Sequence, residues 1–321
     1  MDLQLEHELS RHVAFALNAS GGTYTYRFGY TGGFGSYDPF FTQQSTANFF
    51  DSPTIFPQTS GRLIYRKNAR LSFAFGGGAL LVRRRSSALY GATGYNAGAD
   101  MSYRLARFMS VGADYGFTHY DFLRVFGGAN IHTAAGNFSM RLSKSWEMGF
   151  RAGVFRAETQ QVVSVAIDPL IAAITGQSAA VVANYSVVYS PMFNARLSHA
   201  FRRGGCVVSY GRGVTPGNGV FLTARTDTAG FDCSYTAQRR WSLGAGVGYS
   251  KMSTLGQTIA AYQYINARAG ASRTLAKGLS FSLGAAMVND LSSYNALGRQ
   301  RYYQATVGFA YSPGELPLTL C

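Results

Sequence analysis

The chain has 321 residues, a formal net charge of +14 and 47% hydrophobic residues, of which many are aromatic, with 21 Tyr and 23 Phe. No run of about 18 apolar residues occurs, so the sequence excludes a transmembrane helix. The first residues, "MDLQLEHELSRH", lack the basic and then apolar pattern of a secretory leader. We therefore expect a cytosolic chain, a processed chain, or one without its true N-terminus.

The positive charge does not by itself indicate a nucleic-acid partner. Lys and Arg are spread along the chain as singles and pairs, without a helix-turn-helix, zinc or RNA-binding signature around them. Cys206, Cys233 and Cys321 form an odd set without CxxC spacing, which implies neither a disulfide framework nor a zinc site. Because Cys206 and Cys233 fall on apolar faces, we expect them to be buried or lipid-facing thiols.

Short basic breaks recur along the chain, and each joins two runs of alternating apolar and small or polar residues. The breaks lie in residues 8–15, 64–73, 103–111, 140–150, 195–208, 234–244 and 272–281. This spacing of about 40 residues fits a repeated hairpin of two strands. In chain order we expect strands near residues 2–9, 12–20, 60–66, 69–82, 89–104, 108–120, 129–142, 146–158, 182–198, 204–213, 221–236, 240–251, 259–273, 278–289 and 300–312.

Alternation with period two divides each strand into an apolar and a polar face. Met148 and Phe150, for example, lie opposite Glu147 and Arg151. A β-sandwich would also produce alternating faces, but it does not predict that short and long connections alternate along the chain. A parallel β-solenoid requires a fixed rung period, which is absent. An antiparallel up-and-down barrel explains the alternation, the hairpin repeat and the two kinds of connection.

The chain resembles bacterial outer-membrane β-barrel proteins, and the resemblance covers nearly its whole length. It rests on strands such as "WSLGAGVGYSKM" and "GLSFSLGAAMVND", on aromatic residues near strand ends, and on the terminal strand "RYYQATVGFAYSP", in which Tyr311 matches the usual final aromatic residue. The resemblance implies an all-β transmembrane barrel in the bacterial outer membrane, porin-like and without a cofactor. It also implies contact with outer-membrane lipid and lipopolysaccharide, and assembly by the barrel-assembly machinery.

We expect a single barrel domain over residues 1–321 with about 14–16 strands and long extracellular loops at 29–59 and 158–180. Bacterial single-chain barrels have an even number of strands, whereas about fifteen are counted here. The odd count indicates either that an N-terminal strand and a signal peptide are missing, or that the first run stays outside the barrel. The segment "DPLIAAITG" in the second loop predicts a short helix from Asp168 to Gly176.

A barrel of this size is near the limit at which an aqueous lumen opens. The residues expected to face the lumen are Asp100, Arg104, Asp114, Arg141, Glu147, Arg151, Arg196, Asp232 and Arg268. Their basic excess could favour anionic solutes, or the charges could pair across neighbouring strands. At the long-loop side, Arg83, Arg84 and Arg85 predict a basic cluster beside lipopolysaccharide, or only a solvated turn.

The sequence contains few signals of catalysis. His119 and His132 flank one loop beside Asp121, but no set of nucleophile, base and orienting group can be identified, and we expect no metal site and no enzyme. The leading hypothesis is a passive outer-membrane pore or channel for small polar solutes, with anionic solutes as one option. The alternatives are an occluded structural or adhesive barrel that acts through its long loops and, third, a membrane-embedded hydrolase.

Overall fold

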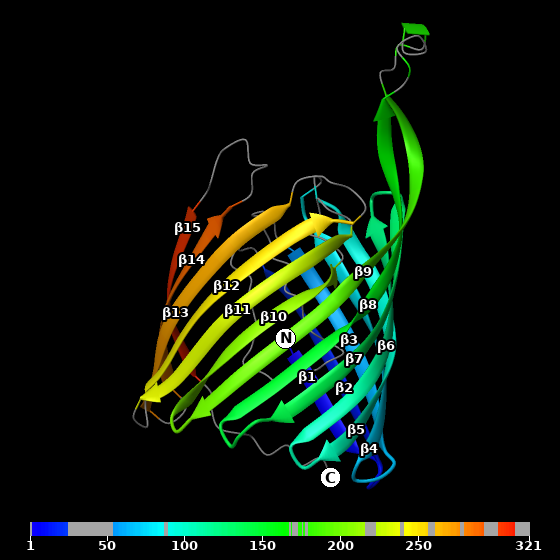
Figure 1. Cartoon of the computed structure of the whole chain (residues 1–321). Coiled ribbons are helices and arrows are strands. Elements are labelled where there is room, and N and C mark those ends of the chain that lie inside the picture. The colour runs from blue at the N-terminus through cyan, green and yellow to red at the C-terminus, as the bar shows by residue number, and fades with distance from the viewer. Residues whose placement is uncertain are drawn as a thin grey trace, which may run out of the picture.

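A computed structural model shows one antiparallel sheet of fifteen strands in which every strand pairs with its neighbours in the sequence. The structure describes residues 2–24, 54–86, 89–166, 168, 173–174, 176, 179–215, 223–237, 241–255, 261–276, 279–291 and 301–311. The sheet curls into a barrel (Figure 1). Among the described residues, no helix is long and apolar enough to cross a membrane.

The fifteen strands closely follow the runs expected from the sequence. They are β1 (Asp2–Glu8), β2 (Val13–Tyr24), β3 (Thr54–Arg66), β4 (Leu71–Arg84), β5 (Gly91–Ala106), β6 (Met109–Leu123), β7 (Gly127–Arg141), β8 (Trp146–Ala166), β9 (Ala179–Phe201), β10 (Gly204–Thr215), β11 (Ala224–Ala237), β12 (Trp241–Thr254), β13 (Tyr262–Ala276), β14 (Leu279–Asp290) and β15 (Arg301–Tyr311).

Short and long connections alternate along the chain, as the sequence predicts. Among the described residues, the basic breaks become connections of two to four residues, such as 9–12 between β1 and β2, 107–108 between β5 and β6 and 202–203 between β9 and β10. The connections at the opposite end vary more and reach their greatest length at residues 25–53. We call these the short-turn end and the long-connection end of the barrel.

The first run of the chain joins the sheet, so the alternative in which it stays outside the barrel is wrong. β1 pairs with β2 from Asp2 opposite Ser20 to Glu8 opposite Ala14. The pairings of the described residues do not connect β1 to β15. Because the strand number is odd, these two edge strands run in the same direction.

Both predicted long loops are shorter than expected. Residues 54–59 belong to β3, which pairs with β2 as far as Tyr24 opposite Thr54. β8 and β9 continue past the predicted strand ends and pair up to Ala166 opposite Ala179. Their extensions are rich in valine, which favours strands, so the polar residues near 158–161 do not end β8.

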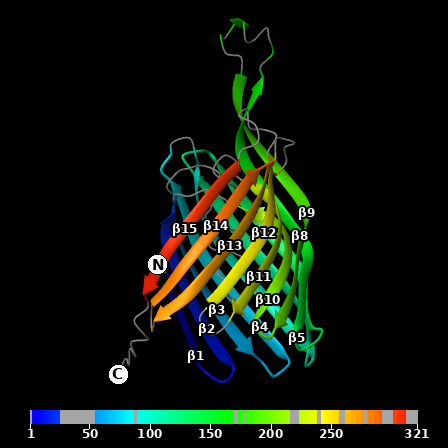
Figure 2. The same ribbon diagram turned by 90° about the vertical axis from the view of Figure 1, so that its left-hand side faces the viewer.

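The β8–β9 hairpin rises above the other strands in both views (Figures 1 and 2). β7 pairs with β8 only as far as Gln161, and β10 pairs with β9 only as far as Phe193. The predicted helix lies mostly outside the described residues, in which Ala173 and Ile174 are helical. Gly176 has a left-handed φ of 68°, a conformation that suits glycine at the end of a helix.

Candidate functional site: the inner face of the barrel

The two faces of the sheet differ in exposure and in residue type. One face carries exposed apolar side chains such as Val208, Phe231 and Val247, which lie opposite one another in register. The other face carries nearly all the buried side chains, among them Phe155 and Ile131. Because a curled sheet shields its concave side, the second face is the inner face of the barrel.

All nine charged residues that the sequence assigns to the lumen lie on this inner face. The registers connect them strand by strand: Asp100 lies opposite Asp114, Glu147 opposite Arg141, and both Asp232 and Arg268 opposite Gly246. Alternation within β5, β8 and β9 places the rest on the same face. The nine are Asp100, Arg104, Asp114, Arg141, Glu147, Arg151, Arg196, Asp232 and Arg268.

Three aspartates of the inner face are paired with arginines two strands away. Nε of Arg151 lies 2.9 Å from Oδ1 of Asp114, and their side chains are only 13% and 6% exposed. Nη2 of Arg268 lies 2.6 Å from Oδ1 of Asp232. The sequence left open whether such charges pair, and the geometry favours pairing for these residues.

The third aspartate has a partner that the sequence prediction omitted. Nη2 of Arg62 in β3 lies 3.8 Å from Oδ1 of Asp100 in β5. The sequence already indicated that Arg62 faces the lumen. It is next to Leu63, whose side chain points outward, and consecutive residues of a strand face opposite sides. Only the position of β4 between the two strands shows that the arginine and the aspartate meet.

A glycine makes room for the Arg268–Asp232 pair as it crosses β12. A Cβ atom on Gly246 would lie 2.1 Å from Oδ1 of Asp232 and 3.2 Å from Nε of Arg268. Even one methyl group would therefore collide with the aspartate. The pair depends on the absence of a side chain at this position.

Replacing Gly246 by valine is expected to separate Arg268 from Asp232 and to reduce the free energy of unfolding by about 1–3 kcal/mol, the usual cost of overpacking. Urea unfolding of the protein in phospholipid vesicles measures this change. Gly244→Val is the matched control, because a Cβ atom there has its nearest contact at 3.9 Å, with the carbonyl oxygen of Cys233. Equal stability of the two variants would contradict the expected clash.

The other four predicted lumen residues gather towards the short-turn end. Arg104, Arg141 and Glu147 line a small cavity of about 160 Å³. Arg196 lies opposite Gly149 on the next strand, and all four side chains are exposed. Three arginines and one glutamate give this end of the inner face a net positive charge.

The inner wall formed by β11 to β15 is concave, and small side chains make up much of its lining, beside larger ones such as Tyr264 and Gln304. A cavity of about 600 Å³ follows this wall, and its lining includes Ser242, Asn266, Arg268, Ser282 and Thr306. Glycines at several inner positions add no side chains to this wall, which leaves space inside the barrel. A water-filled path along the barrel therefore fits this side best.

The opposite inner wall is not polar throughout, contrary to the polar second face that alternation predicts. A buried apolar cluster near the long-connection end combines residues of β5 to β9 with Leu255, which follows β12, and its member Phe155 has 0% exposure. Its other members include Tyr120, Phe122, Ile131 and Met192. The interior thus combines an apolar region with ion pairs closer to the short-turn end.

The three arginines at the end of β4 do not form one outward cluster. Arg83 and Arg85 are exposed, but Arg84 is 4% exposed on the inner face, and its Nη1 donates to the carbonyl oxygen of Tyr90 at 2.6 Å. Adjacent residues of a strand point to opposite faces, which separates Arg84 from its neighbours. The predicted basic cluster is therefore wrong for Arg84.

The two histidines at the β6–β7 connection have separate partners on the outer face. His119 Nε2 lies 2.9 Å from Asp121 Oδ2, whereas His132 Nδ1 lies 2.7 Å from the hydroxyl of Tyr115. Within the described part of the chain, no three metal-ligating side chains come together. Structural contacts account for both rings.

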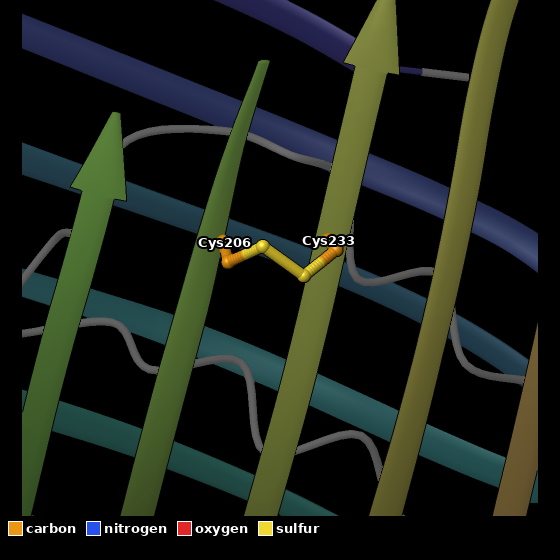
Figure 3. The surroundings of a disulfide bond; sticks show 2 residues. All are labelled: Cys206 and Cys233. Carbon is orange, nitrogen blue, oxygen red and sulfur yellow. A yellow bond between two sulfur atoms is a disulfide. The ribbon is translucent and has the colours of Figure 1, made fainter. Parts of the chain in front are cut away.

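Cys206 and Cys233 form a disulfide on the outer face, so the expectation of two free thiols is wrong (Figure 3). The two residues lie directly opposite each other in β10 and β11, with 4.1 Å between their Cα atoms. Only the register brings them together, because 27 positions separate them in the sequence. Such a bond is typical of an oxidising compartment.

Removing the disulfide with Cys206→Ala and Cys233→Ala is expected to lower the free energy of unfolding by roughly 3–4 kcal/mol, since the unfolded chain loses a constraint. Urea unfolding in vesicles measures the change. Cys321→Ala is the control and should leave stability unaltered. Alkylation of both thiols in folded, unreduced protein would show that the bond does not form.

No family model and no curated protein sequence matches the chain. Solved structures do match. The ferric citrate transporter FecA in its unliganded form aligns with a TM-score of 0.55 and 11% identity, over 98% of this chain and 55% of that chain. The copper transporter OprC aligns with a TM-score of 0.50 and 9% identity, over 98% of this chain and 58% of that one.

These likenesses establish the fold alone, and they confirm the predicted outer-membrane β-barrel architecture. A further match, to the ferric yersiniabactin uptake receptor FyuA from Yersinia pestis, has 11% identity and a TM-score of 0.48 over 88% of this chain and 50% of that chain. The chain spans about half the length of each of these three structures.

Proposed function

We propose that the protein is a channel of the bacterial outer membrane that passes small polar solutes. The observation that carries this proposal is the concavity along β11 to β15, about 600 Å³ in volume, whose lining includes serine, asparagine, threonine, glutamine and Arg268 among small and apolar residues. The outer face supports the location, because its exposed valine and aromatic side chains suit contact with lipid. Outer-membrane lipid, lipopolysaccharide and the barrel-assembly machinery are the corresponding partners.

Anion preference is assigned to the short-turn end of the inner face. The arginines of the ion pairs contact carboxylates, which largely neutralise their charge. At the short-turn end, in contrast, three arginines, Arg104, Arg141 and Arg196, face a single acidic residue, Glu147. Clustered charge of one sign in a cleft concentrates counter-ions. The channel should therefore prefer small anions to small cations.

Single-channel recording in a planar bilayer tests both parts of the proposal. Folded protein is expected to conduct ions, and a salt gradient should give a reversal potential of anion-selective sign. Replacing Arg104, Arg141 and Arg196 by glutamine should abolish the selectivity and preserve conductance. Arg268→Gln, in the paired region, is the comparison variant and should have the smaller effect on selectivity.

The second candidate is an occluded barrel that acts through its long connections. The buried apolar cluster of β5 to β9 favours it, because that cluster fills part of the interior. The raised β8–β9 hairpin also favours it (Figure 1). Absence of conductance from protein whose folding is verified by its heat-dependent gel mobility would reject the channel and favour this alternative.

A further inference from the structure

Three basic residues lie next to one aspartate on the outer face of β10 to β12, close to the long-connection end, and two of them contact its carboxylate. In register, Asp227 of β11 lies opposite Arg212 of β10 and Lys251 of β12. Arg225 lies two residues away on β11 and points to the same face. We call Arg212, Arg225 and Lys251 together with Asp227 the basic outer cluster; its net charge is +2.

Asp227 organises the cluster without neutralising it. Nε of Arg212 donates to Oδ1 of Asp227, and the hydroxyl of Tyr210 lies 3.4 Å from the same oxygen. Nε of Arg225 lies 4.0 Å from Oδ2, which is too long for a hydrogen bond. The side chain of Asp227 is buried beneath these groups, while those of Arg212 and Arg225 are each about one-third exposed.

An apolar surface continues from the cluster towards the short-turn end. Val208, Phe231 and Val247 lie opposite one another in register, four residues from Arg212, Asp227 and Lys251 on their respective strands. Each of the three apolar side chains is about half exposed. At about 3.4 Å per residue, the two regions are separated by roughly 13 Å along the strands.

We propose that the basic outer cluster binds the phosphate groups of a phosphorylated glycolipid in the outer leaflet. Guanidinium and ammonium groups hold phosphate oxygens through charge-assisted hydrogen bonds, and the apolar surface beside them fits the acyl chains of the same lipid. The cluster lies at the long-connection end, and outer-membrane barrels place their longer loops on the extracellular side. The outer leaflet of the bacterial outer membrane presents such a lipid at this depth.

This inference rests on the outer-membrane location and not on conduction through the barrel. It is separate from the predicted lipopolysaccharide contact at Arg83 to Arg85, where Arg84 faces inward and Arg83 and Arg85 are exposed. A barrel that conducts no ions could still bind the glycolipid, and a conducting barrel could fail to bind it. A negative result for one proposal therefore does not contradict the other.

The test compares lipid adducts by native mass spectrometry of the detergent-extracted, full-length protein. The probes are diphosphorylated lipid A, the same lipid with both phosphates removed, phosphatidylglycerol and inorganic phosphate. Wild-type protein is expected to retain diphosphorylated lipid A at least about tenfold better than the dephosphorylated form, as loss of charge-assisted bonds implies. Equal retention of the two forms would overturn the proposal, as would preference for phosphatidylglycerol or for phosphate alone.

The variant Arg225→Gln with Lys251→Gln leaves the Arg212–Asp227 contact in place and removes two charges. It is expected to lose the preference for the phosphorylated lipid by at least about tenfold. The matched control is Arg273→Gln, an outward arginine near the short-turn end, where its guanidinium lies 5.2 Å from the ring centre of Trp241. If both variants lower retention equally, or if neither does, the assigned site is wrong; heat-dependent gel mobility verifies that each variant folds.

Discussion

Replacing Asp114 by asparagine is expected to lower the free energy of unfolding by about 3–5 kcal/mol, because it leaves the charge of Arg151 without its carboxylate. Both side chains are shielded from solvent on the inner face, and Asn137 donates its Nδ2 to the same aspartate at 3.4 Å. An asparagine preserves the shape of the site but not its charge. Urea unfolding in vesicles, followed by the fluorescence of Trp146 and Trp241, measures the loss.

The double variant Asp114→Asn with Arg151→Gln is the control for this effect. It removes both charges, so it should recover a large part of the stability that the single variant loses. A single variant within about 0.5 kcal/mol of wild type would mean that water already screens the pair, since changes of that size are typical of surface positions. The inner face would then be wetter than its burial indicates.

Replacing Phe155 by alanine is expected to cost about 3–5 kcal/mol of the free energy of unfolding, because it opens a cavity in the inner apolar cluster. Phe155 has 0% exposure and belongs to the same cluster as Ile131 and Met192. If the cluster also narrows the barrel, the same variant should raise single-channel conductance. The two measurements separate a structural role from an occluding one.

Phe150→Ala is the matched control on the same strand. Phe150 points to the outer face, where its ring centre lies 5.4 Å from that of Phe138. Lipid can fill the space that its ring leaves, so the expected loss is clearly smaller than at Phe155. Similar losses at the two positions would contradict the assignment of the inner and outer faces.

Much of the fold could be predicted from local sequence. Strand existence, the short basic turns and the inner or outer position of Asp100, Arg151 and Arg268 all follow from a period of two, which depends only on neighbouring residues. The strand ends were less predictable. The polar residues from Glu158 to Gln161 predicted the start of a loop. In the structure, β8 continues to Ala166, because it pairs with β9 up to that residue.

The contacts of the candidate site could not be predicted in the same way. Arg62 meets Asp100, and Arg268 meets Asp232, because each arginine crosses an intervening strand at a particular register. The disulfide and the basic outer cluster depend on register in the same way. A shift of two residues between β10 and β11 would keep every face assignment and separate Cys206 from Cys233.

The sequence by itself determined an antiparallel up-and-down barrel of about fifteen strands and the inner position of the nine charged residues assigned to the lumen. Only the tertiary structure decided which charges pair, that an apolar cluster is buried inside the barrel, and that Asp227 of the outer face lies beside Arg212, Arg225 and, in register, Lys251. The physical reason is the range of each effect. Alternation is set by backbone geometry within one strand, whereas pairing is set by the alignment of strands that are distant in the sequence.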